Sequence, residues 1–276
     1  MEYIANNHIR LPLLGLGTFS MHGEELRNVV TEAVRSGYYL FDTATKYKNE
    51  KDLGTVLNDT PNLFLQSKVH AGQLWGNIRY LRLNKKDVKK SLALSSKRLG
   101  VSPYIYLLHS PFSGYEHFFK ELAEIRDKGV VNGIGVCNVN LEQLVKLISM
   151  TGQKPDVIQV EMHPYHSNQK LIEYCHDHGI LVEARSPLAH GDALPEWQSN
   201  RLLQEISRRH GKTIPQIILR WIIQQKVVVI VRSGNPVHIR QNMDIFDFSL
   251  TAQEIVEIHS INKNLSFGFF STKTKK

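Results

Sequence analysis

The sequence predicts a closed (β/α)8 barrel, the TIM-barrel architecture, preceded by an N-terminal β-hairpin. Short apolar runs with high β propensity alternate with helical patterns eight times, as parallel strands joined by helices require. No linker or low-complexity segment interrupts this alternation. The length of 276 residues is ordinary for one such barrel. We therefore expect a single barrel domain over residues 1–276, with residues 271–276 as a disordered tail.

The hairpin is predicted over residues 2–12, with Asn6-Asn7 as its turn. The barrel strands are predicted at the eight runs rich in apolar and β-branched residues: Leu14–Thr18, Tyr39–Asp42, Leu63–Lys68, Tyr104–His109, Gly133–Cys137, Val157–Gln159, Ile180–Glu183 and Val227–Val231. Helices are predicted where apolar residues recur every three or four positions: Glu24–Ser36, Glu50–Leu57, Lys86–Leu99, Tyr115–Lys128, Leu141–Met150, Gln169–His178, Arg201–Gln225, Pro236–Met243 and Thr251–Ile261.

The composition is that of a globular protein, with 42% hydrophobic and 22% charged residues. The apolar runs are too short to span a membrane, and the N-terminus lacks the pattern of a signal peptide. Two cysteines are too few for a disulfide framework and fit a reducing compartment, so we expect a cytoplasmic protein. We also expect a monomer. The net charge of +8 fits an anionic partner such as a phosphorylated cofactor.

Four polar residues stand at or just after the ends of predicted neighbouring strands: Asp42, Tyr47, Lys68 and His109. For one strand alone, Asp42 as a turn cap and Tyr47 as a surface side chain would be the simpler interpretation. In a closed α/β barrel, however, the carboxyl ends of the strands form the active face. The arrival of Lys68 and His109 from the next two strands therefore favours a shared site.

These four residue types form a coherent acid–base set. A tyrosine, with an ordinary pKa of about 10, is a poor proton donor at neutral pH, and a neighbouring ammonium group lowers that pKa. A buried ammonium needs a counter-ion, which Asp42 can supply. The imidazole of His109 can hydrogen-bond the carbonyl oxygen that Tyr47 protonates. Such a site donates a proton to a carbonyl group while another group delivers a hydride.

Motifs along nearly the whole chain resemble those of the aldo-keto reductase superfamily, in the same order. They are Leu14–Phe19, Phe41–Ala44 with Tyr47, Asn49, Glu50 and Gly54, Ser67-Lys68, Leu107–Pro111, Gly133–Val136 with Asn138, Gln159–Tyr165, Ser186–Leu188, Gly211–Thr213, Leu219–Trp221, and Asn242 with Phe246–Phe248. Each motif alone is weak, whereas the ordered set is specific.

The resemblance implies an NADPH-dependent reductase of small aldehydes and ketones. Tyr47 would be the general acid, Lys68 would lower its pKa, Asp42 would pair with Lys68, and His109 would orient the carbonyl group. Further residues are implied to bind the cofactor, with Asn138 and Gln159 on the carboxamide and Ser186 and Leu188 along the pyrophosphate. The full cofactor set is Gly17, Thr18, Asp42, Cys137, Asn138, Gln159, Arg185, Ser186, Leu188, Arg232, Ser233, Gly234, Asn235, His238, Gln241 and Asn242.

The chain has no G-x-G-x-x-G motif, so the phosphates need another site. Residues 232–236 join a guanidinium, a hydroxyl and a glycine-bearing turn to a helix start, which favours an anion site over an ordinary loop. Phe19, Trp75 and Phe112 are expected to form an apolar mouth for the substrate.

The sequence departs from the family at three places. Arg185 stands where the family usually has an aromatic residue that stacks on the nicotinamide, and its charge is expected to disfavour the oxidised ring. Cys137 replaces a serine and is a weaker hydrogen-bond donor, or simply a small buried hydrophobe. Arg232 replaces a lysine and His238 an arginine near the 2′-phosphate. Because histidine is mostly uncharged at neutral pH, NADH is the alternative cofactor.

Parts of the sequence are also compatible with three other functions. A cofactor-binding but non-catalytic barrel, resembling the potassium-channel β-subunits, remains the main alternative. A metal-dependent hydrolase is suggested by thirteen histidines, but no closed ligand set is present, so we expect no metal. Nucleic-acid binding is suggested by basic residues between Lys85 and Arg98, but no aromatic stacking platform accompanies them, so we expect no nucleic-acid partner.

Overall fold

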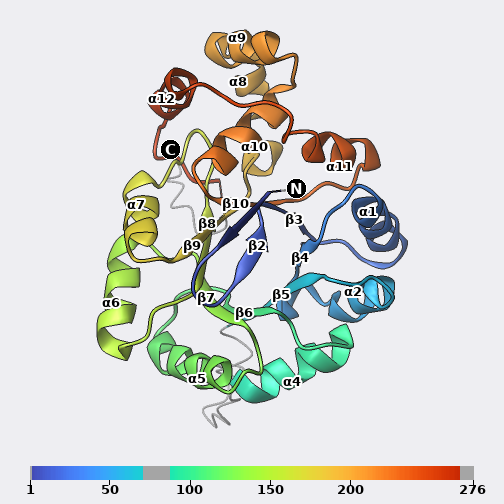
Figure 1. Cartoon of the computed structure of the whole chain (residues 1–276), viewed down its shortest axis with the longest axis vertical. Coiled ribbons are helices and arrows are strands. Elements are labelled where there is room, and N and C mark those ends of the chain that lie inside the picture. Colours follow the sequence, from blue (N-terminus) through green and yellow to red (C-terminus); the bar gives the residue numbers. More distant parts are fainter. Residues whose placement is uncertain (1, 71–87, 268–276) are drawn as a thin grey trace, which may run out of the picture.

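The computed structural model describes residues 2–70 and 88–267 and forms a closed barrel of parallel strands (Figure 1). Around the barrel the strands follow the order β10-β3-β4-β5-β6-β7-β8-β9. Their bounds are Leu14–Gly17 (β3), Leu40–Asp42 (β4), Phe64–Val69 (β5), Ile105–Leu108 (β6), Gly133–Cys137 (β7), Val157–Glu161 (β8), Leu181–Arg185 (β9) and Val228–Val231 (β10). The predicted (β/α)8 barrel is confirmed, and each strand lies within two residues of its expected bounds.

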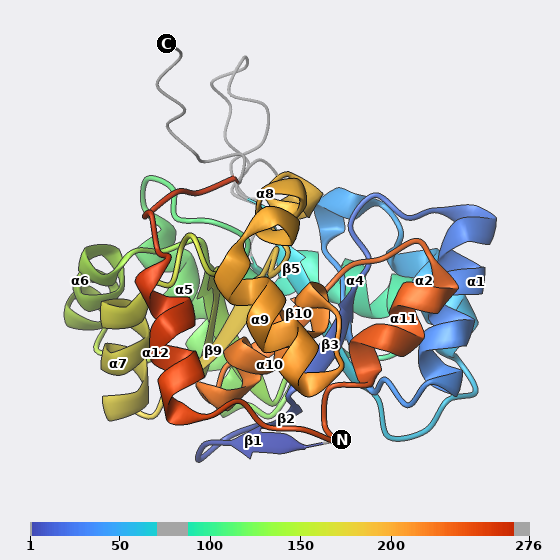
Figure 2. The same cartoon turned by 90° about the horizontal axis from the view of Figure 1, so that it is seen from above.

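Two short strands, β1 (Tyr3–Ala5) and β2 (Arg10–Pro12), form the expected antiparallel hairpin. Its turn spans four residues rather than two, because Asn6 Oδ1 accepts hydrogen bonds from the backbone N–H of both His8 and Ile9, each at 3.0 Å. Figure 2 shows the hairpin beneath one end of the barrel, with the helix α8 (Leu194–Ser199) at the other end. The end that carries the strand-end residues is therefore not covered by the hairpin.

Helices surround the barrel and cover the outer faces of the strands (Figure 1). Besides α8, their bounds are Gly23–Arg35 (α1), Glu50–Leu57 (α2), Val88–Leu99 (α4), Tyr115–Asp127 (α5), Leu141–Thr151 (α6), Gln169–Asp177 (α7), Arg201–His210 (α9), Ile214–Gln224 (α10), Pro236–Met243 (α11) and Ala252–Ser260 (α12). The first two residues of the helix predicted from Lys86 lie outside the described residues.

One predicted helix was wrong in length. The pattern from Arg201 to Gln225 is two helices, because Gly211 has a left-handed backbone (φ +62°) that ends α9. Thr213 then begins α10 with a capping box, in which its side chain accepts from the N–H of Gln216. The short helix α8 was not predicted at all.

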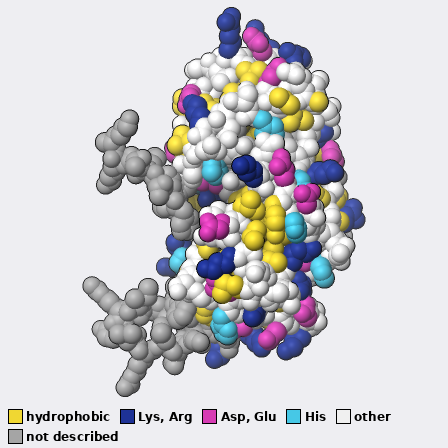
Figure 3. Space-filling model, turned by 90° about the vertical axis from the view of Figure 1, so that its left-hand side faces the viewer, with side chains coloured by type: hydrophobic (Ala, Val, Ile, Leu, Met, Phe, Trp, Pro, Cys, Tyr) yellow, Lys and Arg dark blue, Asp and Glu magenta, His cyan; other side chains and the backbone are white. Residues whose placement is uncertain are grey.

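The length of the helices and the charges on the surface are relevant to possible partners. Within the described residues, no helix has the length and apolar character needed to cross a membrane. Figure 3 shows basic and acidic side chains interspersed on one face of the molecule, with a small hydrophobic group between them. That face therefore carries charges of both signs.

Candidate active site

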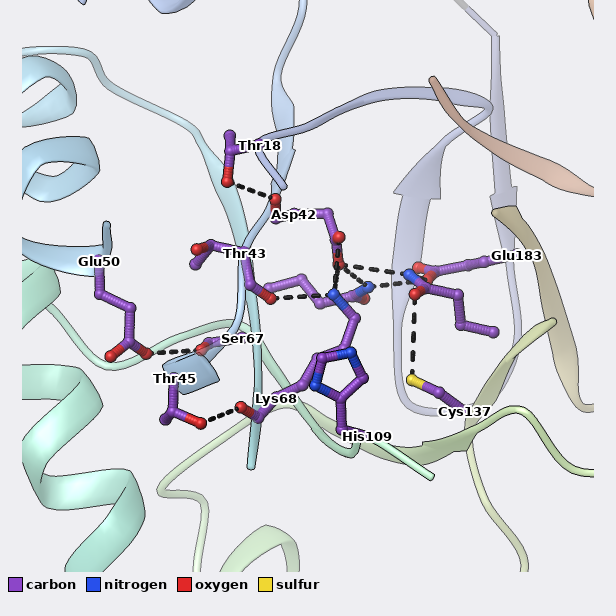
Figure 4. A network of polar contacts seen from close by, with 12 residues as sticks. Thr18, Asp42, Thr43, Thr45, Glu50, Ser67, Lys68, His109, Cys137 and Glu183 are labelled. Atoms are coloured by element: carbon purple, nitrogen blue, oxygen red, sulfur yellow. Dashed lines mark hydrogen bonds and ion pairs between the residues drawn. The ribbon is translucent and has the colours of Figure 1, made fainter. Parts of the chain in front are cut away.

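The core of the site is a buried ion pair between neighbouring strands, Asp42 at the end of β4 and Lys68 near the end of β5 (Figure 4). Lys68 Nζ lies 2.6 Å from Oδ1 and 2.7 Å from Oδ2 of Asp42, and donates to the backbone oxygen of Thr43 at 2.9 Å. The side chain of Lys68 is 0% exposed. Burial alone would lower the pKa of Lys68, but the Asp42 carboxylate outweighs it and raises that pKa, so the ammonium stays charged.

Tyr47 lies over this ion pair, at the end of the 3-10 turn Thr45–Tyr47. Lys68 Nζ is 5.1 Å from the centroid of the Tyr47 ring. The rings of His109 and Phe19 lie edge-on to the Tyr47 ring, with centroids at 5.6 and 5.1 Å. The turn is held because Thr45 Oγ1 donates to the backbone oxygen of Lys68 at 2.8 Å. The four residues predicted as an acid–base set thus lie together.

The electrostatics of Tyr47 and His109 follow from this placement. Burial raises the pKa of Tyr47, and the charge of Lys68 acts against that rise without cancelling it. Sequence reasoning considered only the lowering by Lys68. Burial, followed by the charge of Lys68, lowers the pKa of His109 to about 2, so its imidazole is neutral at physiological pH. Its Nδ1 is buried without a hydrogen-bond partner among the described residues.

The loop that carries Tyr47 is fixed by Asn49, a fully buried residue whose role the sequence did not reveal. Asn49 Oδ1 accepts from Thr43 Oγ1 at 2.7 Å, while Nδ2 donates to the backbone oxygens of Thr18 (2.8 Å) and Met21 (3.0 Å). Thr18 Oγ1 itself donates to the backbone oxygen of Asp42 at 2.9 Å, so this hydroxyl joins the ends of β3 and β4. The amide therefore ties the loop between β3 and α1 to the loop between β4 and α2, which carries Tyr47.

A second carboxylate, Glu183 of β9, shares two amide donors with Asp42 inside the barrel (Figure 4). Gln66 Nε2 donates to Asp42 Oδ1 at 2.8 Å and to Glu183 Oε2 at 2.7 Å. Gln159 Nε2 donates to the same two oxygens at 3.2 and 2.9 Å. One cation, Lys68, therefore faces two carboxylates in a buried network, and Glu183 Oε1 has no partner among the described residues.

Burial, followed by the charge of Asp42, raises the pKa of Glu183 from its ordinary 4.5 to about 7. The folded chain then holds this proton more tightly than the unfolded chain, so the free energy of unfolding should fall as pH rises from about 4.5 to 7. The fall attributable to Glu183 is about 3 kcal/mol. Glu183→Gln is neutral at every pH and is expected to remove this slope. Urea unfolding at pH 5, 6, 7 and 8 measures the free energy of unfolding of the unsubstituted protein and of Glu183→Gln. If this free energy changed with pH in the same way in both, the prediction would be contradicted.

The expected nicotinamide side of the site contains Asn138, Ser186 and Arg185. Asn138 and Ser186 have left-handed backbones (φ +61° and +50°) directly after β7 and β9, and the side chains of both accept hydrogen bonds from Arg185. Leu188 follows at the start of a 3-10 turn. Cys137 is fully buried, and its Sγ lies 3.9 Å from Gln159 Oε1, which fits the small-hydrophobe interpretation better than a strong donor.

The expected phosphate side lies between β10 and α11. Arg232 is exposed and donates to the backbone oxygen of Phe19 (2.6 Å) and to Ser20 Oγ (3.1 Å). Ser233 Oγ accepts from the N–H of Asn235, whose side chain caps α11 through the N–H of Val237. The remaining residues predicted for this side differ in their exposure to solvent. Gly234, His238 and Gln241 are exposed, Asn242 is buried, and Gly17 lies buried at the end of β3.

The expected apolar mouth is described in part. Phe19 is 42% exposed and stacks edge-on against Tyr47, and Phe112 is half-buried near α5. Trp75 lies outside the described residues. In the part of the chain that the structure describes, no group of three or more histidine, cysteine or acidic side chains could hold a metal ion.

Sequence reasoning missed three buried polar residues of the site: Gln66, Glu161 and Glu183. Gln66 and Glu183 stand inside apolar strands and Glu161 ends one, and burying an isolated polar residue costs free energy unless it has a partner. A polar residue in such an apolar run therefore predicts a buried hydrogen-bond partner. In a barrel that partner comes from another strand.

Comparison with known proteins agrees with the geometry. A family model described as Aldo/keto reductase family matches residues 13–263. Glyoxal reductase of Bacillus subtilis (strain 168) is 34% identical, over 95% of this chain and 93% of its own. Methylglyoxal reductase DkgA of Escherichia coli (strain K12) is 32% identical, over 94% and 92%.

Solved structures agree as well. An aldo-keto reductase from a Medee basin deep-sea metagenome library has a TM-score of 0.86 at 31% identity, covering 100% of this chain and 99% of its own. An aldo-keto reductase of Bombyx mori, solved in complex with NADP, has a TM-score of 0.84 at 26% identity, covering 98% and 95%. With the family model spanning most of its length, this chain belongs to the aldo-keto reductase family.

Proposed function

We propose that the chain reduces aldehydes and ketones to alcohols with NADPH, and that Tyr47 is the general acid. The observation that carries this proposal is the placement of Tyr47 over the Lys68–Asp42 ion pair and beside the neutral His109. The four residues come from three different strands and their loops, and packing alone would not select this set. A cofactor-binding but non-catalytic barrel is not favoured, because it would not need Tyr47, Lys68 and His109 together.

The residues divide the work of protonating a carbonyl oxygen. NADPH, when bound, supplies the hydride that adds to the carbonyl carbon. Tyr47 gives its phenolic proton to the oxygen on which negative charge develops, and Lys68 stabilises the resulting phenolate. Asp42 keeps Lys68 charged. His109, being neutral, can donate one N–H to the same oxygen without placing a second full charge there.

The residues present fit the cofactor. Glycine at position 17 fits the close packing at the end of β3, since an added Cβ would lie 3.2 Å from Ile230 Cγ2. Asn138 would contact the carboxamide. Gln159 Nε2 already donates to Asp42 and Glu183, so Oε1 is the atom of Gln159 that would contact the carboxamide. Arg232, Ser233 and the start of α11 would hold the phosphate of the adenosine end.

The test is NADPH oxidation, followed at 340 nm, with a panel of aldehydes, ketones and sugars. Methylglyoxal and glyoxal belong in the panel because two of the relatives are named for them. We expect turnover with at least one small aldehyde, and a smaller rate with NADH. Tight binding of NADPH without turnover of any carbonyl compound would contradict the proposal and favour the non-catalytic barrel. We also expect a monomer, which size-exclusion chromatography with light scattering measures.

A further inference from the structure

Arg185 brings a positive charge to the expected nicotinamide side of the site. Its Nε donates to Asn138 Oδ1 at 2.6 Å, and its Nη1 donates to Ser186 Oγ at 3.3 Å. Asn138 in turn donates from Nδ2 to the backbone oxygen of His109 at 2.8 Å. The guanidinium is therefore separated by two hydrogen bonds from the residue proposed to orient the carbonyl group.

This position is close to where the hydride donor must lie. Reacting atoms approach to about 3–3.5 Å before a transfer. A carbonyl group held by Tyr47 and His109 therefore requires the nicotinamide ring near these two residues, and Arg185 is linked to His109 through Asn138. The charge of Arg185 reaches His109. Burial and the charge of Lys68 are the main causes that lower the pKa of His109 to about 2, and the charge of Arg185 contributes to the same lowering.

Glu161 is the counter-ion of Arg185, and it is shared. Its Oε2 lies 3.3 Å from Arg185 Nη2 and accepts from Ser266 Oγ at 2.7 Å. Its Oε1 lies 3.0 Å from His163 Nε2 and accepts from the N–H of Phe267 at 2.6 Å. Burial raises the pKa of Glu161, but these hydrogen bonds outweigh it and hold that pKa below its ordinary range. The negative charge of Glu161 is also shared with these other hydrogen-bond donors. Glu161 therefore offsets only part of the electrostatic field of Arg185.

We propose that Arg185 makes the protein bind the reduced cofactor in preference to the oxidised one, and that Glu161 limits this preference. The inference rests on the proposed function. The reduced nicotinamide ring is neutral and the oxidised ring carries a positive charge, so only the oxidised ring is repelled by the guanidinium. Like charges within about 5–8 Å in a partly dry site are expected to change a ratio of binding constants by about tenfold. The oxidised product is then released more readily.

The test is the ratio of the dissociation constants of NADP+ and NADPH, measured by fluorescence titration. Arg185→Met removes the charge and keeps the length, and it should lower this ratio about tenfold. Arg185→Lys keeps the charge and should retain most of the preference, which separates charge from packing. Glu161→Gln leaves Arg185 without its counter-ion and should raise the ratio, opposite in sign to Arg185→Met.

A matched control lies on the far side of the molecule. Arg126 pairs with the buried Asp156 at 3.4 Å with a side-chain exposure of 12%, against 3.3 Å and 22% for Arg185 with Glu161. Arg126→Met should leave the ratio unchanged. An unchanged ratio in Arg185→Met, with both cofactors bound, overturns the inference alone. Failure of the unsubstituted protein to bind either cofactor overturns the proposed function and the inference with it.

Discussion

Tyr47→Phe is expected to lower kcat/KM for NADPH-dependent aldehyde reduction by about 10²–10⁴-fold, the usual contribution of a positioned general acid. Only the phenolic oxygen is removed. The ring contacts with Phe19 and His109 and the position over Lys68 remain available to phenylalanine. The loss should therefore appear in kcat, while the dissociation constant of NADPH changes little. Stopped-flow and steady-state assays at 340 nm, together with fluorescence titration of NADPH, measure both.

Tyr115→Phe is the matched control for this substitution. Tyr115 is also buried and donates one hydrogen bond, to the backbone oxygen of Gln143 at 3.0 Å, but it belongs to α5 and adjoins only the expected mouth residue Phe112 among the described residues assigned to the site. Its removal should cost some stability and leave kcat unchanged. If Tyr47→Phe retained full kcat, another residue would have to supply the proton, and the assignment of Tyr47 would be wrong.

Lys68→Met is expected to reduce the free energy of unfolding by about 3–5 kcal/mol, since it leaves a buried carboxylate without its cation. Asp42 is 3% exposed, and in the described ranges Lys68 is the only cation that forms an ion pair with it. Asp42→Asn should cost a similar amount because it strands the buried ammonium. The double variant should recover part of the loss, which a double-mutant cycle in urea measures.

The comparison for this prediction is an exposed pair. Lys89 Nζ lies 3.6 Å from Glu124 Oε2, and both side chains are more than half exposed. Lys89→Met should change stability little, because water screens such pairs. If Lys68→Met were as mild as Lys89→Met, the buried pair would contribute little, and its place in the barrel would have to be explained by activity alone.

Much of the fold could be predicted because the barrel repeats one simple pattern. Each strand is a short apolar run buried on both faces, which is easy to recognise and hard to place elsewhere. The prediction failed between Arg201 and Gln225, where apolar periodicity continues through Gly211. There the left-handed backbone and the cap at Thr213 divide the segment, and local geometry overrides the pattern. The six-residue helix α8 is too short for periodicity to identify.

The candidate site could be predicted where residues stand at strand ends. Asp42, Lys68 and His109 share one face simply because parallel strands bring their carboxyl ends together. Glu161 and Glu183 could not be found this way, since their partners come from distant parts of the sequence. Glu161 contacts Ser266 and Phe267, more than a hundred residues away, and no local pattern encodes that contact.

The amide-bridged network also has a mechanical consequence. Asp42 and Gln66 belong to β4 and β5, whereas Gln159 and Glu183 belong to β8 and β9, which lie across the ring of strands from them. The two walls are therefore held at a fixed spacing by hydrogen bonds rather than by apolar packing alone. Loops at the rim can move to admit a ligand without altering that diameter. Backbone amides of these four strands should accordingly be among the last in the chain to exchange with deuterium.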